Sequence, residues 1–194
     1  MGFTETIIRI DQQCQQQINR YWQNGFLDTL APVLREPKSW IPLYLFLAIF
    51  LPWKFGRTGI YWCLGFIATF GVSDFFSASV LKQQVQRIRP CNDPVFSERV
   101  RHIVECGVGY SFPSTHATNH FALALFMAVT LGPRYKWVPW AAVLWAFSVA
   151  YAQVYVGVHY PADVLSGGLL GALIGILTGK LFLSKIGLNE RVVS

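Results

Sequence analysis

The chain has 194 residues, of which 53% are hydrophobic and 13% are charged, and its mean hydropathy is +0.38. A soluble domain usually carries about 25% charged residues, so this composition argues against an apolar soluble helical domain. The net charge is +6, but the basic residues lie at the ends of apolar runs and in one polar loop. That distribution argues against a nucleic-acid-binding face and favours contact with anionic lipid headgroups.

The amino-terminal segment, residues 1–38, mixes polar and apolar residues and lacks the continuous hydrophobic core of a cleavable signal peptide. Between residues 6 and 22, apolar side chains recur near helical spacing opposite a glutamine-rich side. The pattern predicts an amphipathic helix. Such a helix lies either in the membrane interface or against a helical bundle.

Five apolar runs follow, each near the roughly 20 residues needed to cross a bilayer. They cover residues 40–53, 58–81, 114–131, 137–158 and 161–183. Short loops join them without a low-complexity linker, which indicates a single domain over residues 1–194. We therefore predict an all-α, multi-span membrane helical bundle with about five spans and an amino-terminal interfacial helix.

In the last run, glycine recurs every four residues, at Gly167, Gly171, Gly175 and Gly179. This spacing places the four glycines on one helix face, where a neighbouring helix backbone can approach closely. We interpret the glycines as packing residues without a chemical role.

The order of the spans places the polar loop 82–113 and the short turn at His159 on the same side of the membrane. The opposite side receives short basic segments with almost no acidic residues, which is typical of cytoplasmic loops. Their basic residues are Lys54, Arg57, Arg134, Lys136, Lys185 and Arg191. We therefore expect the 82–113 loop to be extracytoplasmic.

The first cluster with chemical potential starts this loop. Lys82 and Arg89 are seven residues apart, so on a continuing helix both side chains would point the same way. Two converging cations form an anion site, and a guanidinium binds phosphate with two hydrogen bonds. The alternative is an ordinary helix end with two interfacial cations.

The second cluster opens the third span. Pro113 and Ser114 are typical helix-opening residues, and the free N–H groups of a first turn can donate hydrogen bonds to phosphate oxygens. His116 is placed to exchange a proton near neutral pH. The alternative is a histidine that only reaches from a helix end towards water.

The third cluster precedes the fifth span, where His159 lies four residues before Asp163. The carboxylate can accept a hydrogen bond from one ring nitrogen and leave the other as a nucleophile. The alternative is that Asp163 only caps the helix.

In this order, the three clusters resemble the motifs of the type-2 phosphatidic acid phosphatase superfamily, which includes bacterial phosphatidylglycerophosphate and undecaprenyl pyrophosphate phosphatases. Lys82, Arg89 and Pro90 match the first motif. Pro113, Ser114 and His116 match the second, with Thr115 where glycine is usual. His159 and Asp163 match the third, whose arginine position holds Gln153.

The resemblance implies a two-step reaction without metal or cofactor. His159 attacks phosphorus, Asp163 orients it, and His116 protonates the leaving oxygen and then activates water. Lys82, Arg89, Ser114 and the Thr115 backbone N–H hold the phosphoryl oxygens. Gln153 donates one hydrogen bond but brings no charge, so we hypothesise that an auxiliary cation replaces the arginine. The candidates in the loop are Arg87, Arg99 and Arg101.

Four further residues need an interpretation. His116 and His120 have a spacing also used for zinc, but no local carboxylate or cysteine accompanies them, so we expect no metal site. Asp74 lies inside the second span and is a candidate for holding Lys82 or a histidine. Cys91 and Cys106 both lie in the loop predicted to be outside, where an oxidising compartment would let them form a disulfide.

The predicted function is hydrolysis of a phospholipid or polyprenyl phosphate or pyrophosphate at the outer face of the cytoplasmic (inner) membrane. The expected partners are the lipid substrate and the bilayer, with no nucleic acid, and the sequence does not indicate an oligomeric state. Two alternatives belong to other classes. One is a weakened lipid-phosphate binding or transport protein, suggested by Gln153. The other is a vanadate-dependent peroxidase-like enzyme, against which the apolar spans argue.

Overall fold

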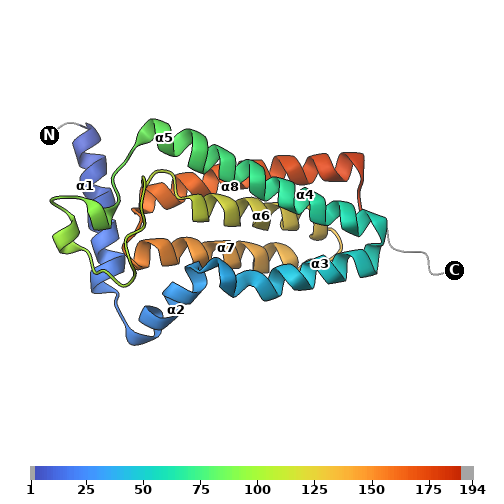
Figure 1. Cartoon of the computed structure of the whole chain (residues 1–194), viewed down its shortest axis with the longest axis horizontal. Helices are drawn as coiled ribbons and strands as arrows, with labels where there is room; N and C mark the ends of the chain where they lie inside the picture. Colours follow the sequence, from blue (N-terminus) through green and yellow to red (C-terminus); the bar gives the residue numbers. More distant parts are fainter. Residues whose placement is uncertain (1–2, 189–194) are drawn as a thin grey trace.

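The computed structural model describes residues 3–188, and all regular secondary structure in this range is helical. The longer helices are shown in Figure 1. They are α1 (Phe3–Gln16), α2 (Gly25–Arg35), α3 (Ile41–Phe55), α4 (Arg57–Asp74), α6 (Thr115–Leu131), α7 (Val138–Tyr155) and α8 (Pro161–Lys185). A π-helical stretch (Phe75–Leu81) and the short α5 (Lys82–Val85) prolong α4.

Helices α3, α4, α6, α7 and α8 lie side by side along the long axis of the molecule (Figure 1). They coincide with the five predicted apolar runs, and the predicted all-α membrane bundle is confirmed. Within residues 3–188, three helices are long and apolar enough to cross a membrane: Arg57–Asn92, Val138–Tyr155 and Pro161–Lys185. Helices α3 and α6 have 15 and 17 residues, so the number of spans stays a prediction.

The outer surface of the bundle is apolar. Ile49 of α3 and Leu144 of α7 are 70% and 71% exposed, and many other large apolar side chains also face outward. Water would oppose so large an apolar surface, whereas lipid tails accommodate it. Inside, Trp62 and Phe126 are fully buried with ring centroids 5.3 Å apart. The helices therefore present apolar side chains both to the surroundings and to the interior of the bundle, which is the pattern expected of a protein in a bilayer.

The glycine ladder packs α8 against α6, as predicted. A Cβ added at Gly171 would lie 2.1 Å from the Thr118 carbonyl oxygen, and one at Gly175 would lie 2.2 Å from the Ala122 carbonyl oxygen. At both positions the backbones are too close for any side chain. This contact fixes the starts of α6 and α8 next to each other.

The amino-terminal segment contains two helices where one was predicted. Helix α1 runs across the end of the bundle, and α2 lies at the same end (Figure 1). A π-helical stretch (Gln17–Tyr21) ends the first helix, and the Asn24 side chain caps the second by accepting a hydrogen bond from Leu27 N at 2.9 Å. The predicted helix corresponds to α1 and the π-helical stretch, and the second helix was not predicted because Asn24 was not recognised as a cap.

The polar face of α1 packs against the protein. Asp11, Gln15 and Asn19 recur every four residues and are buried, whereas Ile7 and Ile8 are 48% and 46% exposed. The two predicted orientations are therefore compatible. The helix contacts the bundle through its polar side and leaves its apolar side for an interface.

We expect Gly171→Ala to lower the free energy of unfolding by about 1–3 kcal/mol, because the new methyl group must push α6 and α8 apart. Gly71→Ala is the matched control, since nothing lies within 4 Å of a Cβ added there. The thermal midpoint in detergent measures both. Equal midpoints for the two variants would contradict the close packing of α6 and α8.

Candidate active site

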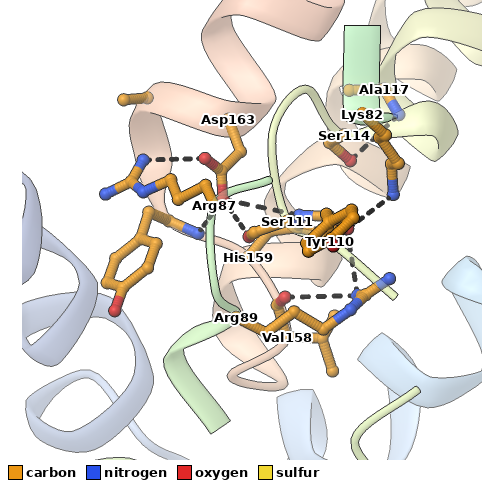
Figure 2. Close-up of polar contacts among 12 residues, drawn as sticks. Lys82, Arg87, Arg89, Tyr110, Ser111, Ser114, Ala117, Val158, His159 and Asp163 are labelled. Carbon is orange, nitrogen blue, oxygen red and sulfur yellow. Dashed lines mark hydrogen bonds and ion pairs between the residues drawn. The ribbon is translucent and has the colours of Figure 1, made fainter. Parts of the chain in front are cut away.

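The three sequence motifs meet at the end of the bundle that α1 and α2 cover. Figure 2 shows Lys82 and Arg89 from the first motif, Ser114 from the second, and His159 and Asp163 from the third within one region. The loop between α5 and α6 closes the region from outside.

His159 is buried in the site, with 1% of its surface exposed. Its Nδ1 lies 3.5 Å from Asp163 Oδ2 and 3.3 Å from Ser111 Oγ, whereas its Nε2 lies 3.4 Å from Arg89 Nη1. One ring nitrogen thus faces a carboxylate and the other faces a cation. Burial lowers the pKa of His159 to about 4, so the imidazole is neutral at pH 7 and its free nitrogen carries a lone pair.

The Asp163 carboxylate is fully buried, and both of its oxygen atoms accept hydrogen bonds. Its Oδ2 accepts hydrogen bonds from Tyr160 N at 2.9 Å and from Ser111 Oγ. Its Oδ1 accepts from Arg87 Nη1 at 2.7 Å. These bonds hold the carboxylate beside His159 in one orientation, which is what the orienting partner of a nucleophile needs.

Arg87 lies on the far side of Asp163 from His159 (Figure 2). Its second amino group donates to Asp11 Oδ2 at 2.6 Å, and its guanidinium carbon lies 4.0 Å from the centroid of the Tyr160 ring. Two carboxylates therefore neutralise Arg87. It connects α1 with the start of α8, and the structure does not bring it to the position of the missing arginine.

Lys82 and Arg89 converge, but not on one helix as predicted. Helix α5 ends at Val85 because Gln86 is left-handed, with φ 52°, and Arg89 is extended, with ψ 149°. Proline at the next position disfavours helical geometry for Arg89. The helix on which both cations would point the same way therefore does not continue beyond Val85, and Pro90 accounts only for the extended geometry of Arg89.

Loop carbonyls bring these two cations together instead. Lys82 Nζ donates to Tyr110 O at 3.0 Å, and Arg89 Nη1 donates to Val158 O at 3.3 Å. Arg89 Nε also donates to Gly109 O at 3.2 Å. The cations are thus held by neutral oxygen atoms, and their charge stays available for an anion.

The start of α6 contributes the second motif. Ser114 is the N-cap, and its Oγ accepts from Ala117 N at 3.4 Å. Ser114 N donates to Asp163 O at 2.9 Å, which ties the start of α6 to that of α8. Thr115 Oγ1 is buried without a hydrogen-bond partner. His116 follows in the first turn and is close enough to His159 for their charges to interact.

Gln153, where the family motif has arginine, is fully buried, and neither atom of its amide has a hydrogen-bond partner. The other two candidate cations are elsewhere. Arg99 is exposed, and Arg101 pairs with Asp28 of α2. The structure thus brings none of the three loop arginines to this position.

Asp74 and His120 form contacts within the bundle. Asp74 Oδ1 accepts from Asn119 Nδ2 at 2.9 Å and interacts electrostatically with Lys82. His120 Nδ1 donates to His116 O at 2.8 Å. Within residues 3–188, no group of three or more His, Cys, Asp or Glu side chains is placed to hold a metal ion.

A disulfide joins Cys91 and Cys106, whose Cα atoms are 5.9 Å apart. It closes a 15-residue segment of the loop that supplies Arg89 on one side and Ser111 on the other. The crosslink therefore restricts the loop that covers His159.

Sequence reasoning missed Ser111 and Asp11. Ser111 Oγ donates to Asp163, and Asp11 binds Arg87 and accepts from Ala162 N at 2.8 Å. Ser111 carries no sequence signal. Asp11 is an acidic residue among glutamines on the polar face of α1, and that placement was the only available indication.

Comparison with known proteins identifies the family. The model of the PAP2 superfamily matches residues 59–185. A lipid A 4'-phosphatase of Bacteroides thetaiotaomicron is 33% identical over 78% of this chain and 68% of its own length. An undecaprenyl-diphosphatase of Sulfolobus acidocaldarius is 31% identical over 80% of this chain and 68% of its own.

A solved structure has the same fold. It is that of a transmembrane PAP2-type phosphatidylglycerolphosphate phosphatase from Bacillus subtilis, with a TM-score of 0.74 and 23% identity, covering 99% of this chain and 91% of the other. The chain therefore belongs to the PAP2 superfamily, and it is a multi-pass membrane phosphatase.

The buried His159 predicts a pH dependence of stability. Its pKa of about 4 lies below the ordinary value of 6.5, so between these pH values the unfolded chain binds a proton that the folded protein does not. The contribution of His159 to stability is therefore lost as the pH falls from about 6.5 to 4.

We expect the thermal midpoint in detergent to fall more steeply over this range for the wild type than for His159→Gln, which lacks the titrating group. All other titrating groups are common to both proteins. Parallel curves for the two proteins would show that His159 titrates normally.

Proposed function

We propose that this phosphatase removes phosphate from a membrane lipid phosphate or pyrophosphate through a phosphohistidine at His159. The observation that carries the proposal is that the two ring nitrogens of His159 have different partners. Its Nδ1 faces Asp163, and its Nε2 faces Arg89 in a region where cations are held by carbonyl oxygens. An anion attracted to those cations meets the lone pair of a neutral histidine.

In the first step, His159 Nε2 forms a bond to phosphorus, and the bond from phosphorus to the lipid oxygen breaks. His116, which enters this step in its protonated form, gives its proton to the leaving oxygen and becomes neutral. In the second step, His116 takes a proton from water, the new oxygen–phosphorus bond forms, and the bond to His159 breaks. Phosphate leaves, and both histidines return to their initial state.

Lys82, Arg89 and the N–H groups at the start of α6 hold the phosphoryl oxygens during both steps. Charge moves onto these oxygens in the transition state, so fixed donors stabilise it more than the ground state. Asp163 stabilises the positive charge that develops on His159 when it attacks.

An apolar groove supports a lipid substrate. It has a volume of about 420 Å³, lies between α3 and α4, and is lined by residues that include Tyr44, Phe66 and Phe70. Tyr44 lies 6.4 Å from Trp145 between ring centroids, and Trp145 lies 4.9 Å from His120, one turn below His116. A tail in this groove would remain in the bilayer while its headgroup reaches the histidines.

The names of the similar proteins indicate which lipids to test first. Because one relative is named for lipid A and another for undecaprenyl diphosphate, we propose a lipid A phosphate or a polyprenyl diphosphate as substrate. Phosphatidic acid and phosphatidylglycerophosphate complete the panel. We propose the whole of residues 1–194 as one catalytic domain.

We expect His159→Ala to reduce phosphate release from this panel by at least about 1,000-fold, because the nucleophile is lost. Incubation of the wild type with substrate and a rapid acid-free quench should show a phosphate on His159 by mass spectrometry. EDTA should leave the rate unchanged. Release that survives in His159→Ala would refute the mechanism, and tight binding without release from any lipid would favour the binding or transport protein.

We also propose that the site faces the extracytoplasmic side of the cytoplasmic membrane. The disulfide between Cys91 and Cys106 supports this orientation, because stable disulfides belong to oxidising compartments. The basic turn between α3 and α4 lies at the opposite end of the bundle (Figure 1), as the positive-inside rule requires.

Single cysteines test this orientation in intact cells. In a background of Cys14→Ser and Cys63→Ser, a membrane-impermeant maleimide should label Glu98→Cys in the loop but not Arg57→Cys at the start of α4. Both side chains are exposed, so each should be labelled once the membrane is permeabilised. The reverse pattern in intact cells would place the site in the cytoplasm.

A further inference from the structure

Arg35, the last residue of α2, is a partly buried cation, and the carboxylate that acts on it electrostatically is that of its exposed neighbour Glu36. Its Nε is buried and has no hydrogen-bond partner, and its side chain forms no hydrogen bond or ion pair within residues 3–188. Burial lowers the pKa of this guanidinium. Buried donors are normally paired in proteins, so the unpaired Nε suggests that this side chain serves a ligand.

The packing of α2 places Arg35 beside the site. Ala31 and Leu34 of α2 pack in the same apolar cluster as Ala152 and Tyr155, which flank Gln153 on α7. The helix therefore ends next to the part of α7 where the family motif has its arginine.

A chain of aromatic contacts fixes this position. Trp40 Nε1 donates to Leu34 O at 2.8 Å and so holds the end of α2. The Trp40 ring lies 5.5 Å from Trp145, which in turn contacts His120 below His116. The end of α2 is thus connected by packed rings to the helix that carries the second histidine.

Electrostatics shows how near Arg35 is to the phosphate site. It is close enough to repel Arg89 and the positive form of His116. The neighbouring Glu36 is exposed, and its side chain accepts from Lys38 N at 3.5 Å. These like charges repel each other, with Asp163 offsetting part of the charge on Arg89 and Glu36 part of that on Arg35, and a bound anion would reduce the repulsion.

Unpaired polar atoms from three helices add an independent indication. Besides Arg35 Nε of α2, they include both amide atoms of Gln153 on α7 and Thr115 Oγ1 on α6. Buried donors and acceptors are almost always satisfied in native proteins. A phosphoryl group accepts several hydrogen bonds at once, so one bound phosphoryl group would satisfy the donors Arg35 Nε and Gln153 Nε2, whereas Gln153 Oε1 is an acceptor and needs a different partner.

We propose that Arg35 supplies the phosphate-binding guanidinium that the third motif lacks at Gln153, with the Gln153 amide donating to the same phosphoryl group. The inference rests on the proposed phosphatase function and names a residue of that site outside all three motifs. The guanidinium comes from the amino-terminal segment, and Gln153 leaves room for it where an arginine would add a second like charge.

The test compares kcat/KM for phosphate release by the wild type, Arg35→Ala, Arg35→Lys and the control Arg20→Ala. Arg20 is an exposed arginine of the same amino-terminal segment. We expect Arg35→Ala to lose on the order of 100-fold, as for removal of one oxyanion donor. Arg35→Lys should lose less, because it keeps the charge but not the two-pronged donor, and Arg20→Ala should resemble the wild type.

Two rescue experiments separate phosphate binding from a structural role. Arg35→Ala combined with Gln153→Arg moves the guanidinium back to the position of the family motif, and it should regain at least tenfold in kcat/KM. Millimolar methylguanidine added to Arg35→Ala should raise its rate and leave the wild type unchanged. Methylguanidine rescue needs no second substitution, so it keeps the test decisive if the double variant does not fold.

Inhibition of phosphate release by orthovanadate, a mimic of the phosphoryl transition state, provides a readout that does not depend on contacts with the lipid tail. Its inhibition constant should rise in Arg35→Ala by a factor similar to the loss in kcat/KM. An active wild type with an equally active Arg35→Ala overturns the inference and leaves the function intact. Loss without methylguanidine rescue and with unchanged vanadate inhibition also overturns it, whereas a wild type inactive on every lipid overturns the proposed function.

Discussion

The buried carboxylate of Asp163 is the contact on which the site depends. It accepts hydrogen bonds from Tyr160 N, Ser111 Oγ and Arg87, and it faces His159 Nδ1. A charge without these donors would be too costly to bury. Because the donors come from different parts of the chain, satisfying Asp163 also draws the loop and the start of α8 together around His159.

The cations on the two sides of this carboxylate have different partners. On one side, Arg87 lies between Asp11 and Asp163 and is fully compensated. On the other side, Lys82 and Arg89 donate to loop carbonyls and repel each other. The compensated side holds the fold together. The uncompensated side favours an anion, and it is the side that His159 Nε2 faces.

The amino-terminal helices complete the site from outside the region that the family model matches, which begins at residue 59. Helix α1 contributes Asp11 to the anchor of Asp163, and α2 ends at Arg35 beside Gln153. The departure from the family motif at Gln153 therefore coincides with a cation delivered by a different segment. Apolar packing of α2 on α7 positions that segment, so the chemistry of the site relies on contacts far from the motifs.

The sequence by itself determined the all-helical bundle, the approximate limits of its five long helices, the close-packing glycine face of α8 and the three motifs. These features follow from apolar periodicity and short spacings, which are local properties. Only the tertiary structure decided that Lys82 and Arg89 converge through loop carbonyls, that Arg87 binds Asp11 and that α2 ends at the site. Arg87 and Asp11 are 76 residues apart in sequence, and the packing of helices brings such partners together, which no local pattern encodes.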